Sequence, residues 1–439
     1  MKTFKVAILG CGTVGGGVAR ILTESGENIS QRSYCNMELH SIVELEPVKA
    51  SENFNVPIKL FCGEGKNLTK EETGKYIDEI LNNPDIDLVV ETIGGCNDFI
   101  ENLCIRILKS GKHLVTANKA LLAERGSSIY KAAEVSNKII GFEAAVCGAI
   151  PIIKTIKESF TGDKIKSISG IMNGTSNYIL SKMQDEKMDF EEALRLAQEK
   201  GFAEADPTLD INGGDAGHKL IILMKMAFGL ELGMNELTIE GIQNITIDDI
   251  EFAKEINSTI KLICFAQRLN GNVYATVCPM MVKNDNFLSD INGATNAVKV
   301  INKYSGKQIL VGAGAGSLET ASSIVADIVF IARYEGSIKN DSVTEPVQFI
   351  DARHFQFPYI VTFETEDQPG ITGLVTTAIG KQNINIDTVS HNMHKSDKAI
   401  FSIATMPCTL QQIEDAVSEI RSKNPNILLK DPKIIPILY

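Results

Sequence analysis

The stretch FKVAILGCGTVGGGVARILTE, residues 4–24, decides the fold of this chain. Its first part predicts a strand over residues 4–9, and its second part predicts a helix over residues 14–24. A G-x-G-x-x-G motif lies between them. In this motif Gly10 would make the tight turn, Gly12 would let the backbone approach a pyrophosphate, and Gly15 would let the helix pack closely on the strand.

The motif is weak evidence alone, but its place between a strand and a helix predicts a dinucleotide site. The phosphates would lie on the helix N-terminus, beside Thr13 and Val14. The alternative is a glycine-rich turn that binds no nucleotide. A second turn, at Thr92 and Ile93, also closes a strand and is a candidate contact for the ribose or nicotinamide. An ordinary strand-to-helix turn explains that segment nearly as well.

The residue after the second strand bears on the choice of cofactor. An acidic side chain there favours NAD, because it binds a free ribose 2′-OH, whereas Arg favours NADP. Glu44 follows the strand and no Arg is near, so the sequence favours NAD without deciding against NADP. The alternatives are that Glu44 is a plain surface residue and that Lys49 meets a 2′-phosphate.

Alternating strands and helices continue through the first 150 residues, which form the predicted dinucleotide-binding domain. This alternation predicts an α/β fold with a parallel, doubly wound, Rossmann-like sheet. The further strands are expected at residues 40–43, 86–91, 113–117 and 139–143, and the further helices at 99–109 and 127–135.

The pattern changes after residue 150. Residues 151–311 predict a mixed α+β domain, in which a sheet is covered by helices. Its strands are expected at 165–172, 273–282, 296–302 and 308–311, and its helices at 190–200, 219–229 and 250–268. A further helix over 317–334 follows the glycine-rich segment 312–316.

The last part of the chain predicts a separate unit. Residues 336–357 are typical of a linker, and residues 358–439 have a βαββαβ order, which is ferredoxin-like. Its elements are expected at 359–364, 371–381, 386–392, 399–404, 410–423 and 434–438.

Composition limits the possible partners and compartments. The chain has 439 residues, enough for two or three domains, and a net charge of −12 with a pI near 5.2, which argues against nucleic acid and anionic membranes as partners. No apolar run has the length of a membrane span, and the N-terminus does not resemble a signal peptide. Nine Cys without C-x-x-C spacing indicate reduced thiols, as expected for a cytoplasmic protein.

The segment Gly201–Lys219 carries the densest group of charges that would suit catalysis. Asp215 and Lys219 are four residues apart, so they share one face of a helix whose continuation is apolar. A surface ion pair is the common outcome of this spacing, but a buried pair favours a functional site. Lys119 ends a predicted strand, where open α/β sheets bind ligands; a solvated Lys that begins the next helix is the alternative.

The segment Asn173-Gly174-Thr175 follows another predicted strand and opens a helix. Its N–H groups and hydroxyls suit a carboxylate. Helix capping by Asn173 or Thr175 requires the same residue types and is the alternative.

These pieces, in this order, resemble the homoserine dehydrogenase family over roughly residues 1–335. The most specific match is the charged, glycine-rich segment 204–219. The next is the run of glycines in 312–316 together with Thr320-Ala321-Ser322. The other matching motifs are Gly10–Gly15, Thr116–Lys119, Glu143–Val146 with Gly148 and Pro151, and Asn173–Thr175. The resemblance makes 151–311 a substrate-binding and dimerisation domain and lets 312–335 complete the first domain.

The resemblance implies an NAD(P)-dependent oxidoreductase that interconverts L-homoserine and L-aspartate 4-semialdehyde in threonine and methionine biosynthesis. Lys119 and Lys219 are then the candidate acid–base residues, with Asp215 orienting Lys219. Glu204 would take the substrate ammonium and Asp210 would support the pocket. The predicted cofactor contacts are Gly10, Gly12, Thr13, Val14, Gly15, Glu44, Thr92, Ile93, Lys119, Gly314 and Glu319.

The family also binds a monovalent cation, sodium or potassium, near the hinge. Glu143 and the backbone of Val146, Gly148 and Ile150 match that site, and oxygen ligands suit a hard cation. Three residues depart from the family pattern and bear on specificity and on the cofactor loop rather than on the reaction class: Phe202 replaces a frequent Tyr, Cys147 a small residue and Glu319 a common Pro.

Residues 358–439 resemble an ACT domain, a small amino-acid-sensing module. The turn with Asp367, Pro369 and Gly370, together with Asn385, matches the effector-binding region. This implies a homodimer or homotetramer that is inhibited by L-threonine; an ACT unit kept only for dimerisation is the alternative. Two other readings of the whole chain stay open. One is a non-catalytic regulatory protein that senses NAD(H) and an amino acid, and the other is a dehydrogenase of a related small amino-acid semialdehyde.

Overall fold

Strand β1 (Thr3–Leu9) lies inside the parallel sheet that the sequence predicts. The computed structural model describes residues 2–334, 347–395 and 398–439. In the first sheet the strand order is β2-β1-β3-β4-β5, and all pairs are parallel. Apolar side chains of β1 are buried on both faces, which explains its nearly unbroken apolar sequence. The other strands are β2 (Asn36–Val43), β3 (Leu88–Glu91), β4 (His113–Thr116) and β5 (Ile140–Gly141).

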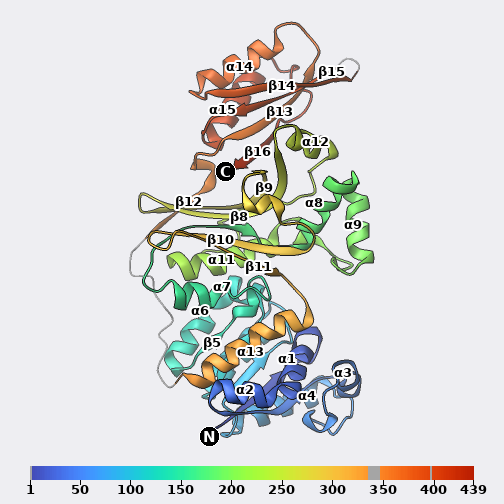
Figure 1. Ribbon diagram of the computed structural model, residues 1–439, viewed down its shortest axis with the longest axis vertical. Coiled ribbons are helices and arrows are strands. Elements are labelled where there is room, and N and C mark those ends of the chain that lie inside the picture. Colours follow the sequence, from blue (N-terminus) through green and yellow to red (C-terminus); the bar gives the residue numbers. More distant parts are fainter. Residues whose placement is uncertain (1, 335–346, 396–397) are drawn as a thin grey trace.

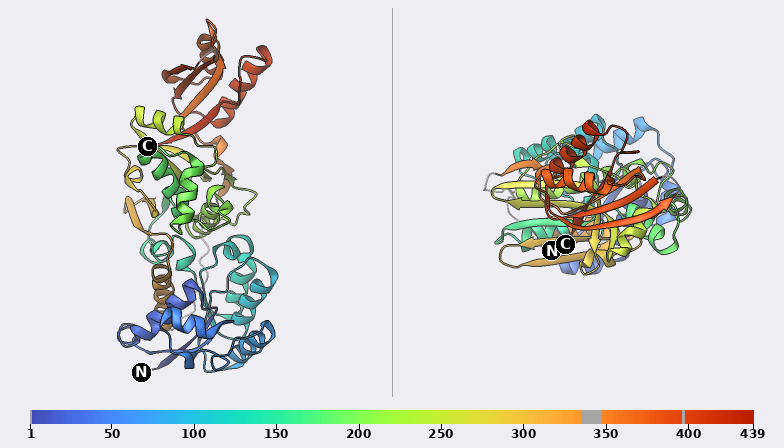
Figure 2. Two further views of the ribbon diagram at one scale, coloured as in Figure 1. Left: turned by 90° about the vertical axis from the view of Figure 1, so that its right-hand side faces the viewer. Right: turned by 90° about the horizontal axis from the view of Figure 1, so that it is seen from above.

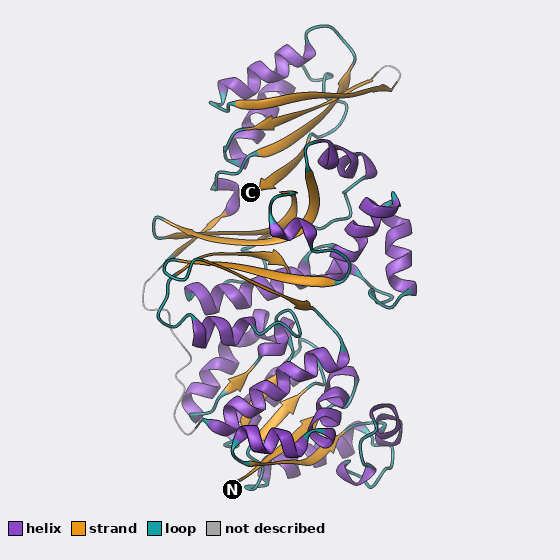
Figure 3. Ribbon diagram, viewed as in Figure 1, coloured by secondary structure: helices purple, strands orange, loops and turns teal. Residues whose placement is uncertain are grey.

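Helices cover both faces of this sheet, as a doubly wound fold requires (Figure 3). Helix α1 packs on one face, and α4, α5 and α6 pack on the other. Helix α13 (Ser317–Arg333) returns to the sheet and packs so closely on α1 that a Cβ at Gly17 would lie 2.7 Å from the Ser317 carbonyl. The helices of this part are α1 (Thr13–Glu24), α2 (Gly26–Ser33), α3 (Pro47–Phe54), α4 (Lys70–Asn82), α5 (Asp98–Lys109) and α6 (Lys119–Ser136).

The middle of the molecule is a larger mixed sheet with helices against it (Figure 1). Its strands follow the order β11-β10-β6-β8-β9, and β7 (Thr238–Ile239) also pairs with β9. The strands are β6 (Ile165–Ile171), β8 (Ser258–Leu269), β9 (Asn272–Lys283), β10 (Thr295–Asn302) and β11 (Lys307–Ala313). The helices are α7 (Ile152–Lys154), α8 (Gly174–Glu186), α9 (Phe190–Glu199), α10 (Thr208–Ile211), α11 (Gly214–Phe228) and α12 (Ile247–Glu255).

The predicted helix over residues 250–268 is wrong. Helix α12 covers the start of that segment and ends at Glu255, Ile256 and Asn257 form a turn, and the segment from Ser258 is β8, which pairs antiparallel with β9 along its whole length. Asn270 and Gly271 connect the two strands with φ of 53° and 82°. An Asn-Gly pair with both φ angles positive is typical of a tight hairpin turn, so the sequence did carry the correct signal.

The C-terminal unit has the predicted βαββαβ order, with strand order β16-β13-β15-β14. Its elements are β13 (Tyr359–Glu366), α14 (Ile371–Lys381), β14 (Ile386–Lys395), β15 (Lys398–Thr405), α15 (Leu410–Lys423) and β16 (Lys433–Leu438). Strand β16 also pairs in parallel with β9, through Ile437 with Met281 and Leu438 with Val282. The unit therefore continues the middle sheet at the end of the molecule opposite the N-terminus (Figures 1 and 2).

The described part of the predicted linker is structured. Strand β12 (Gln348–Asp351) pairs in parallel with β9 and is followed by a short 3-10 helix, Ala352–His354. Residues 336–346 of that prediction lie outside the described residues. Throughout the described part of the chain, every helix is too short or too polar to cross a bilayer.

Candidate active site

The glycine motif has the geometry that its sequence predicts. Gly10 has a φ of 89°, and a Cβ at Gly15 would lie 2.0 Å from the Gly10 carbonyl. A Cβ at Gly12 would meet nothing within 4 Å, so the backbone faces open space there. Gly12 is the N-cap of α1 and provides no side-chain cap. The first N–H groups of α1, at Thr13 and Val14, are therefore arranged to receive a phosphate.

Two other predicted cofactor residues lie beside this loop. The strand order reverses between β1 and β3, where open sheets bind their ligands. Thr92 follows β3, and its hydroxyl donates to the Gly10 carbonyl at 2.8 Å. The N–H of Ile93 donates to the buried carboxylate of Glu91 at 2.9 Å, which fixes the turn.

Glu44 lies against the same loop from the end of β2. One carboxylate oxygen accepts the Cys11 N–H at 2.6 Å, and the other accepts the Leu45 N–H at 2.7 Å. Lys49 is exposed and paired with Glu46 at 2.9 Å. The Glu44 carboxylate therefore lies at the end of β2, beside the glycine loop, with both oxygens hydrogen-bonded to backbone N–H groups.

The glycine-rich segment before α13 approaches the start of α1. The Ser317 hydroxyl donates to the Thr13 carbonyl at 2.5 Å. Gly314 packs on Asn296, and the Glu319 carboxylate folds back on Gly316, where a Cβ would lie 2.3 Å from its oxygen. Glu319 thus lies in the first turn of α13, two residues after the Ser317 contact with the nucleotide loop, whereas Gly314 packs on β10 of the middle sheet.

Lys119, Asp215 and Lys219 form one ion network between the two sheets. Lys119 is the first residue of α6, and Asp215 and Lys219 lie in the first turns of α11. One Asp215 oxygen lies 2.9 Å from the Lys119 Nζ, and the other lies 2.7 Å from the Lys219 Nζ. The Lys219 ammonium also donates to the Met172 carbonyl at 2.6 Å. The alternative of a surface pair does not describe the buried Asp215 and Lys219, whereas Lys119 does begin α6 and keeps 40% of its side chain exposed while it pairs with Asp215.

Burial and charge compete at this network. Burial alone would raise the pKa of Asp215, but Lys219 and Lys119 outweigh it and hold that pKa well below its usual value. Burial alone would lower the pKa of Lys219, but the Asp215 charge reverses the effect and raises it. Both groups are therefore ionised at neutral pH, inside a site that excludes most water.

Asn173 connects this network to the 201–212 loop. Its side-chain N–H group donates to Asp215 at 2.8 Å and to Asp210 at 2.6 Å. Its oxygen caps α8 by accepting the Ser176 N–H at 2.7 Å, so the capping alternative is confirmed for this atom. Burial raises the pKa of Asp210.

The remaining predicted substrate residues differ in position. The Thr175 hydroxyl donates to the Phe202 carbonyl at 2.7 Å, and Gly174 leaves no room for a Cβ beside the Ala294 carbonyl. Glu204 is exposed, and its carboxylate has no hydrogen bond or ion pair with any described residue. Thr175 and Gly174 thus position the loop, whereas Glu204 is available to a ligand.

Glu143, the predicted cation ligand, is buried at the junction of the two sheets. Its oxygens accept the N–H groups of Ile153 and Lys154 at 2.7 and 2.8 Å. Burial and the nearby Asp327 charge raise its pKa to about 7. The carbonyls of Gly148 and Ile150 each accept one hydrogen bond, from Ser323 and Ile152, so each keeps a second lone pair.

The predicted effector residues lie in the C-terminal unit and are exposed: Asp367, Pro369, Gly370 and Asn385. The first three form the turn between β13 and α14, where Gly370 is the N-cap with a φ of 92°. Asn385 precedes β14, and its carbonyl accepts the Met406 N–H at 2.8 Å. The structure does not join them to the ion network.

Sequence reasoning missed three contributors to these sites. They are the Met172 carbonyl, the Lys154–Asp327 ion pair of 2.7 Å beside Glu143, and the contact of His218 with Glu124. His218 stands next to Lys219, which was a usable signal. A backbone carbonyl and a partner from the distant α13 leave no such mark in the sequence.

Comparisons with known proteins agree with this organisation. A family model described as "Homoserine dehydrogenase, NAD binding domain" matches residues 10–143, and one described as "Homoserine dehydrogenase" matches residues 151–329. The homoserine dehydrogenase of Neisseria gonorrhoeae is 34% identical over 432 residues, which is 96% of each chain. That of Helicobacter pylori is 34% identical over 436 residues, which is 99% of each chain.

Solved structures give the same result. A homoserine dehydrogenase from Thiobacillus denitrificans has a TM-score of 0.88 at 31% identity, covering 100% of this chain and 99% of that one. One from S. aureus has a TM-score of 0.76 at 28% identity, with the same coverage. A hyperthermophilic archaeal homoserine dehydrogenase in complex with NADPH shares the fold over 76% of this chain and 100% of that one, with a TM-score of 0.62 at 24% identity. This chain belongs to the homoserine dehydrogenase family.

Proposed function

We propose that this oxidoreductase interconverts L-homoserine and L-aspartate 4-semialdehyde at the network of Lys119, Asp215 and Lys219. The observation that carries the proposal is a buried carboxylate held between two ammonium groups, at 2.9 and 2.7 Å, of which one, Lys119, follows β4 at the same edge of the parallel sheet as the dinucleotide loop after β1. A sensor that only bound a nucleotide would not need two lysines converging there. When bound, the nicotinamide exchanges a hydride with the carbinol carbon of the substrate.

The two lysines are suited to different tasks. Lys219 is buried, its pKa is raised, and its Met172 and Asp215 contacts leave one N–H of its ammonium free. That N–H would donate to the substrate oxygen and stabilise the charge that develops there. Lys119 keeps 40% of its side chain exposed, so it would exchange the hydroxyl proton with solvent.

The substrate's amino-acid end would be bound by the 201–212 loop. Glu204 is exposed and unpaired among the described residues, and so would accept the substrate ammonium. Asp210, held by Asn173 at 2.6 Å, supports that negative region. The backbone N–H groups of Gly174 and Thr175, in the first turn of α8, would bind the substrate carboxylate, while the Thr175 hydroxyl keeps its bond to Phe202.

The test is the initial rate of reduced-cofactor formation from L-homoserine, with NAD and NADP measured in parallel. Turnover is expected with at least one of them. If folded protein binds NAD(H) but does not oxidise L-homoserine with either cofactor, the proposed activity is refuted. The alternative of a non-catalytic protein that senses NAD(H) and an amino acid is then favoured. Faster turnover of another amino-acid alcohol would favour the related dehydrogenase.

Replacing Glu44 by Ala is expected to lower kcat/KM for NAD about 10-fold or more, and to leave kcat/KM for NADP equal or higher. The reason is that a carboxylate binds a ribose 2′-OH and repels a 2′-phosphate. Glu46→Ala is the matched control, since that carboxylate pairs with Lys49 on the surface. The assignment to NAD would be contradicted by a wild-type enzyme that prefers NADP. It would also be contradicted if Glu44→Ala left the ratio of kcat/KM for NAD to kcat/KM for NADP unchanged.

We also propose that a monovalent cation, sodium or potassium, binds at Glu143 and the carbonyls of Val146, Gly148 and Ile150. The cation needs the ionised carboxylate, and the Glu143 pKa is raised to about 7. Affinity should therefore rise with pH and fall about 10-fold per pH unit below that value. Thermal unfolding in NaCl or KCl against choline chloride at equal ionic strength measures this. Glu143→Gln should remove the ion-specific stabilisation, and a pH-independent effect would place the ion elsewhere.

The C-terminal unit supports a regulatory role. Its ferredoxin-like strand order and its exposed turn at Asp367, Pro369, Gly370 and Asn385 suit an ACT-type site for L-threonine between subunits of a homodimer or homotetramer. Adding L-threonine to the rate measurement tests this; no inhibition would favour a unit that only dimerises. The proposed domains are 1–150 with 312–335, then 151–311, and 358–439.

A further inference from the structure

Two side-chain contacts of the same length join helices α6 and α11 near their N-terminal ends, and further along Lys225 of α11 lies 4.1 Å from the centre of the Tyr130 ring of α6. Helix α6 covers the first sheet and begins at Lys119, and α11 packs on the middle sheet and carries Asp215. The Lys119–Asp215 ion pair is 2.9 Å long, and the contact of Glu124 with the His218 Nε2 is also 2.9 Å long. Glu124 lies five residues after Lys119, which is about 7.5 Å further along α6.

In the Glu124–His218 contact, His218 is buried and Glu124 is exposed. His218 is 3% exposed, and within the described ranges its Nδ1 has no partner. Because a carboxylate only accepts hydrogen bonds, the Nε2 carries the hydrogen. The Glu124 side chain is 44% exposed, and its other oxygen meets the Cys96 Sγ at 3.4 Å. Replacing Glu124 therefore changes the contact without opening the core.

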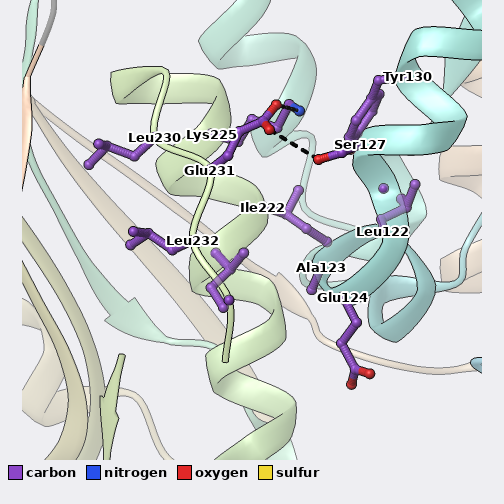
Figure 4. A pocket seen from close by; sticks show the side chains of 13 residues that line it. Leu122, Ala123, Glu124, Ser127, Tyr130, Ile222, Lys225, Leu230, Glu231 and Leu232 are labelled. Carbon is purple, nitrogen blue, oxygen red and sulfur yellow. Dashed lines mark hydrogen bonds and ion pairs between the residues drawn. The ribbon is translucent and has the colours of Figure 1, made fainter. Parts of the chain in front are cut away.

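Beyond this contact, part of the space between the two helices is not filled by side chains. A cavity of about 300 Å³ lies between them, lined by Glu124, Ser127 and Tyr130 of α6 and by Ile222 and Lys225 of α11 (Figure 4). The residues after α11, Leu230–Gly233, close it. Since side chains do not fill this space, packing alone does not set the distance between the helices here.

We propose that Glu124 and His218 form a positioning clamp, which holds α6 on α11 so that the Lys119 ammonium meets Asp215. Lys119 has no other ion pair or hydrogen bond among the described residues. Its place therefore depends on where the first turn of α6 lies. Neither clamp residue is part of the proposed reaction. The inference rests on the proposed function, because it assumes that Lys119 takes part in proton transfer.

The test compares steady-state kinetics of wild type with Glu124→Ala, Glu124→Gln and the control Ser127→Ala. A misplacement of about 1 Å costs about 100-fold in rate, so kcat of Glu124→Ala should fall about 10- to 100-fold. KM values for L-homoserine and cofactor should change less than about 2-fold, and Glu124→Gln should restore most of kcat because its amide oxygen still accepts from Nε2. Ser127→Ala removes the 3.0 Å bond to Glu231 at the far end of the cavity and should leave kcat unchanged.

A double-mutant cycle separates a pair from two independent residues. If the residues act together, His218→Ala and the double variant with Glu124→Ala should both have the kcat of Glu124→Ala. Additive losses would overturn the clamp, and so would an unchanged kcat in Glu124→Ala or a Glu124→Gln no better than Ala. If His218→Ala does not fold, the Glu124 variants decide alone. Absence of homoserine turnover in wild type would instead refute the proposed function.

Discussion

Replacing Lys219 by Met is expected to lower kcat for L-homoserine about 1000-fold, within the 10²–10⁴ range of a lost acid–base or charge-stabilising group. Met keeps the length and apolar stem of the side chain but removes the ammonium. The variant loses the donor to the Met172 carbonyl and to Asp215, at 2.6 and 2.7 Å, and with it the N–H proposed for the substrate oxygen. Cofactor affinity should change little, because the glycine loop is untouched. Single-turnover rates together with NADH titration measure the two effects separately.

Lys225→Met is the matched control on the same helix. Lys225 pairs with Glu231 and lies 4.1 Å from the centre of the Tyr130 ring, away from Asp215. Its replacement should leave kcat within about 2-fold of wild type, because an exposed pair contributes little to structure or rate. A kcat for Lys219→Met within 10-fold of wild type would contradict its role. An equal loss in Lys225→Met would show that the effect comes from the helix as a whole.

The sequence was sufficient wherever a local pattern has one physical solution. A strand, three spaced glycines and a helix predicted the nucleotide loop, and Gly10 and Gly15 have the turn and the close approach expected of them. The spacing of Asp215 and Lys219 predicted a shared helix face, and the apolar residues after them predicted burial. The order of elements after residue 358 was also readable, since each strand and helix there is short and clearly bounded.

The sequence failed where burial on both faces removes periodicity. Strand β8 is buried at nine consecutive residues, Ser258–Ala266, so its sequence has no regular alternation of apolar and polar residues and was interpreted as a helix. The Asn270-Gly271 turn would have corrected this prediction. The meeting of Lys119 with Asp215 is a different case, because it depends on how two sheets pack. No local sequence pattern shows that Lys119 of α6 will pair with Asp215 of α11.

Replacing Asp215 by Asn is expected to lower the free energy of unfolding by about 3–5 kcal/mol at pH 7, the usual cost of breaking a buried ion pair from one side. Asn keeps the shape but leaves the buried Lys219 ammonium without the carboxylate that accepts its hydrogen bond at 2.7 Å. In wild type, burial acts to lower the Lys219 pKa, and the Asp215 charge overcomes it. Asp215 makes the largest contribution that raises the Lys219 pKa, so without its charge burial should dominate, and the Lys219 pKa in the folded variant should fall below its unfolded value of about 10.4.

The stability lost in Asp215→Asn should depend on pH, because the Lys219 pKa is shifted upward in the folded wild type and should be shifted downward in the folded variant. In wild type the folded Lys219 pKa is raised, so its contribution is complete below about pH 10.4 and is lost as pH rises through the folded value. In Asp215→Asn the unfolded chain binds the Lys219 proton more tightly than the folded one, so stability increases as pH rises toward about 10. The difference in free energy of unfolding between wild type and Asp215→Asn should thus be largest near pH 7 and should become smaller toward pH 10. Urea unfolding at about pH 7 and about pH 9.5 measures it.

Asp98→Asn is the control for this measurement. Asp98 pairs with Arg125 at 2.6 Å, but its side chain is 85% exposed, so water replaces the lost partner and the loss should be small at both pH values. If Asp215→Asn costs no more than Asp98→Asn, the network does not hold the two sheets together. If its cost grows as pH rises, Lys219 is not the group left unpaired. If the loss of unfolding free energy in Asp215→Asn is large near pH 7 and becomes smaller as pH rises, its source among these groups is the buried Lys219 ammonium, which has lost its carboxylate partner.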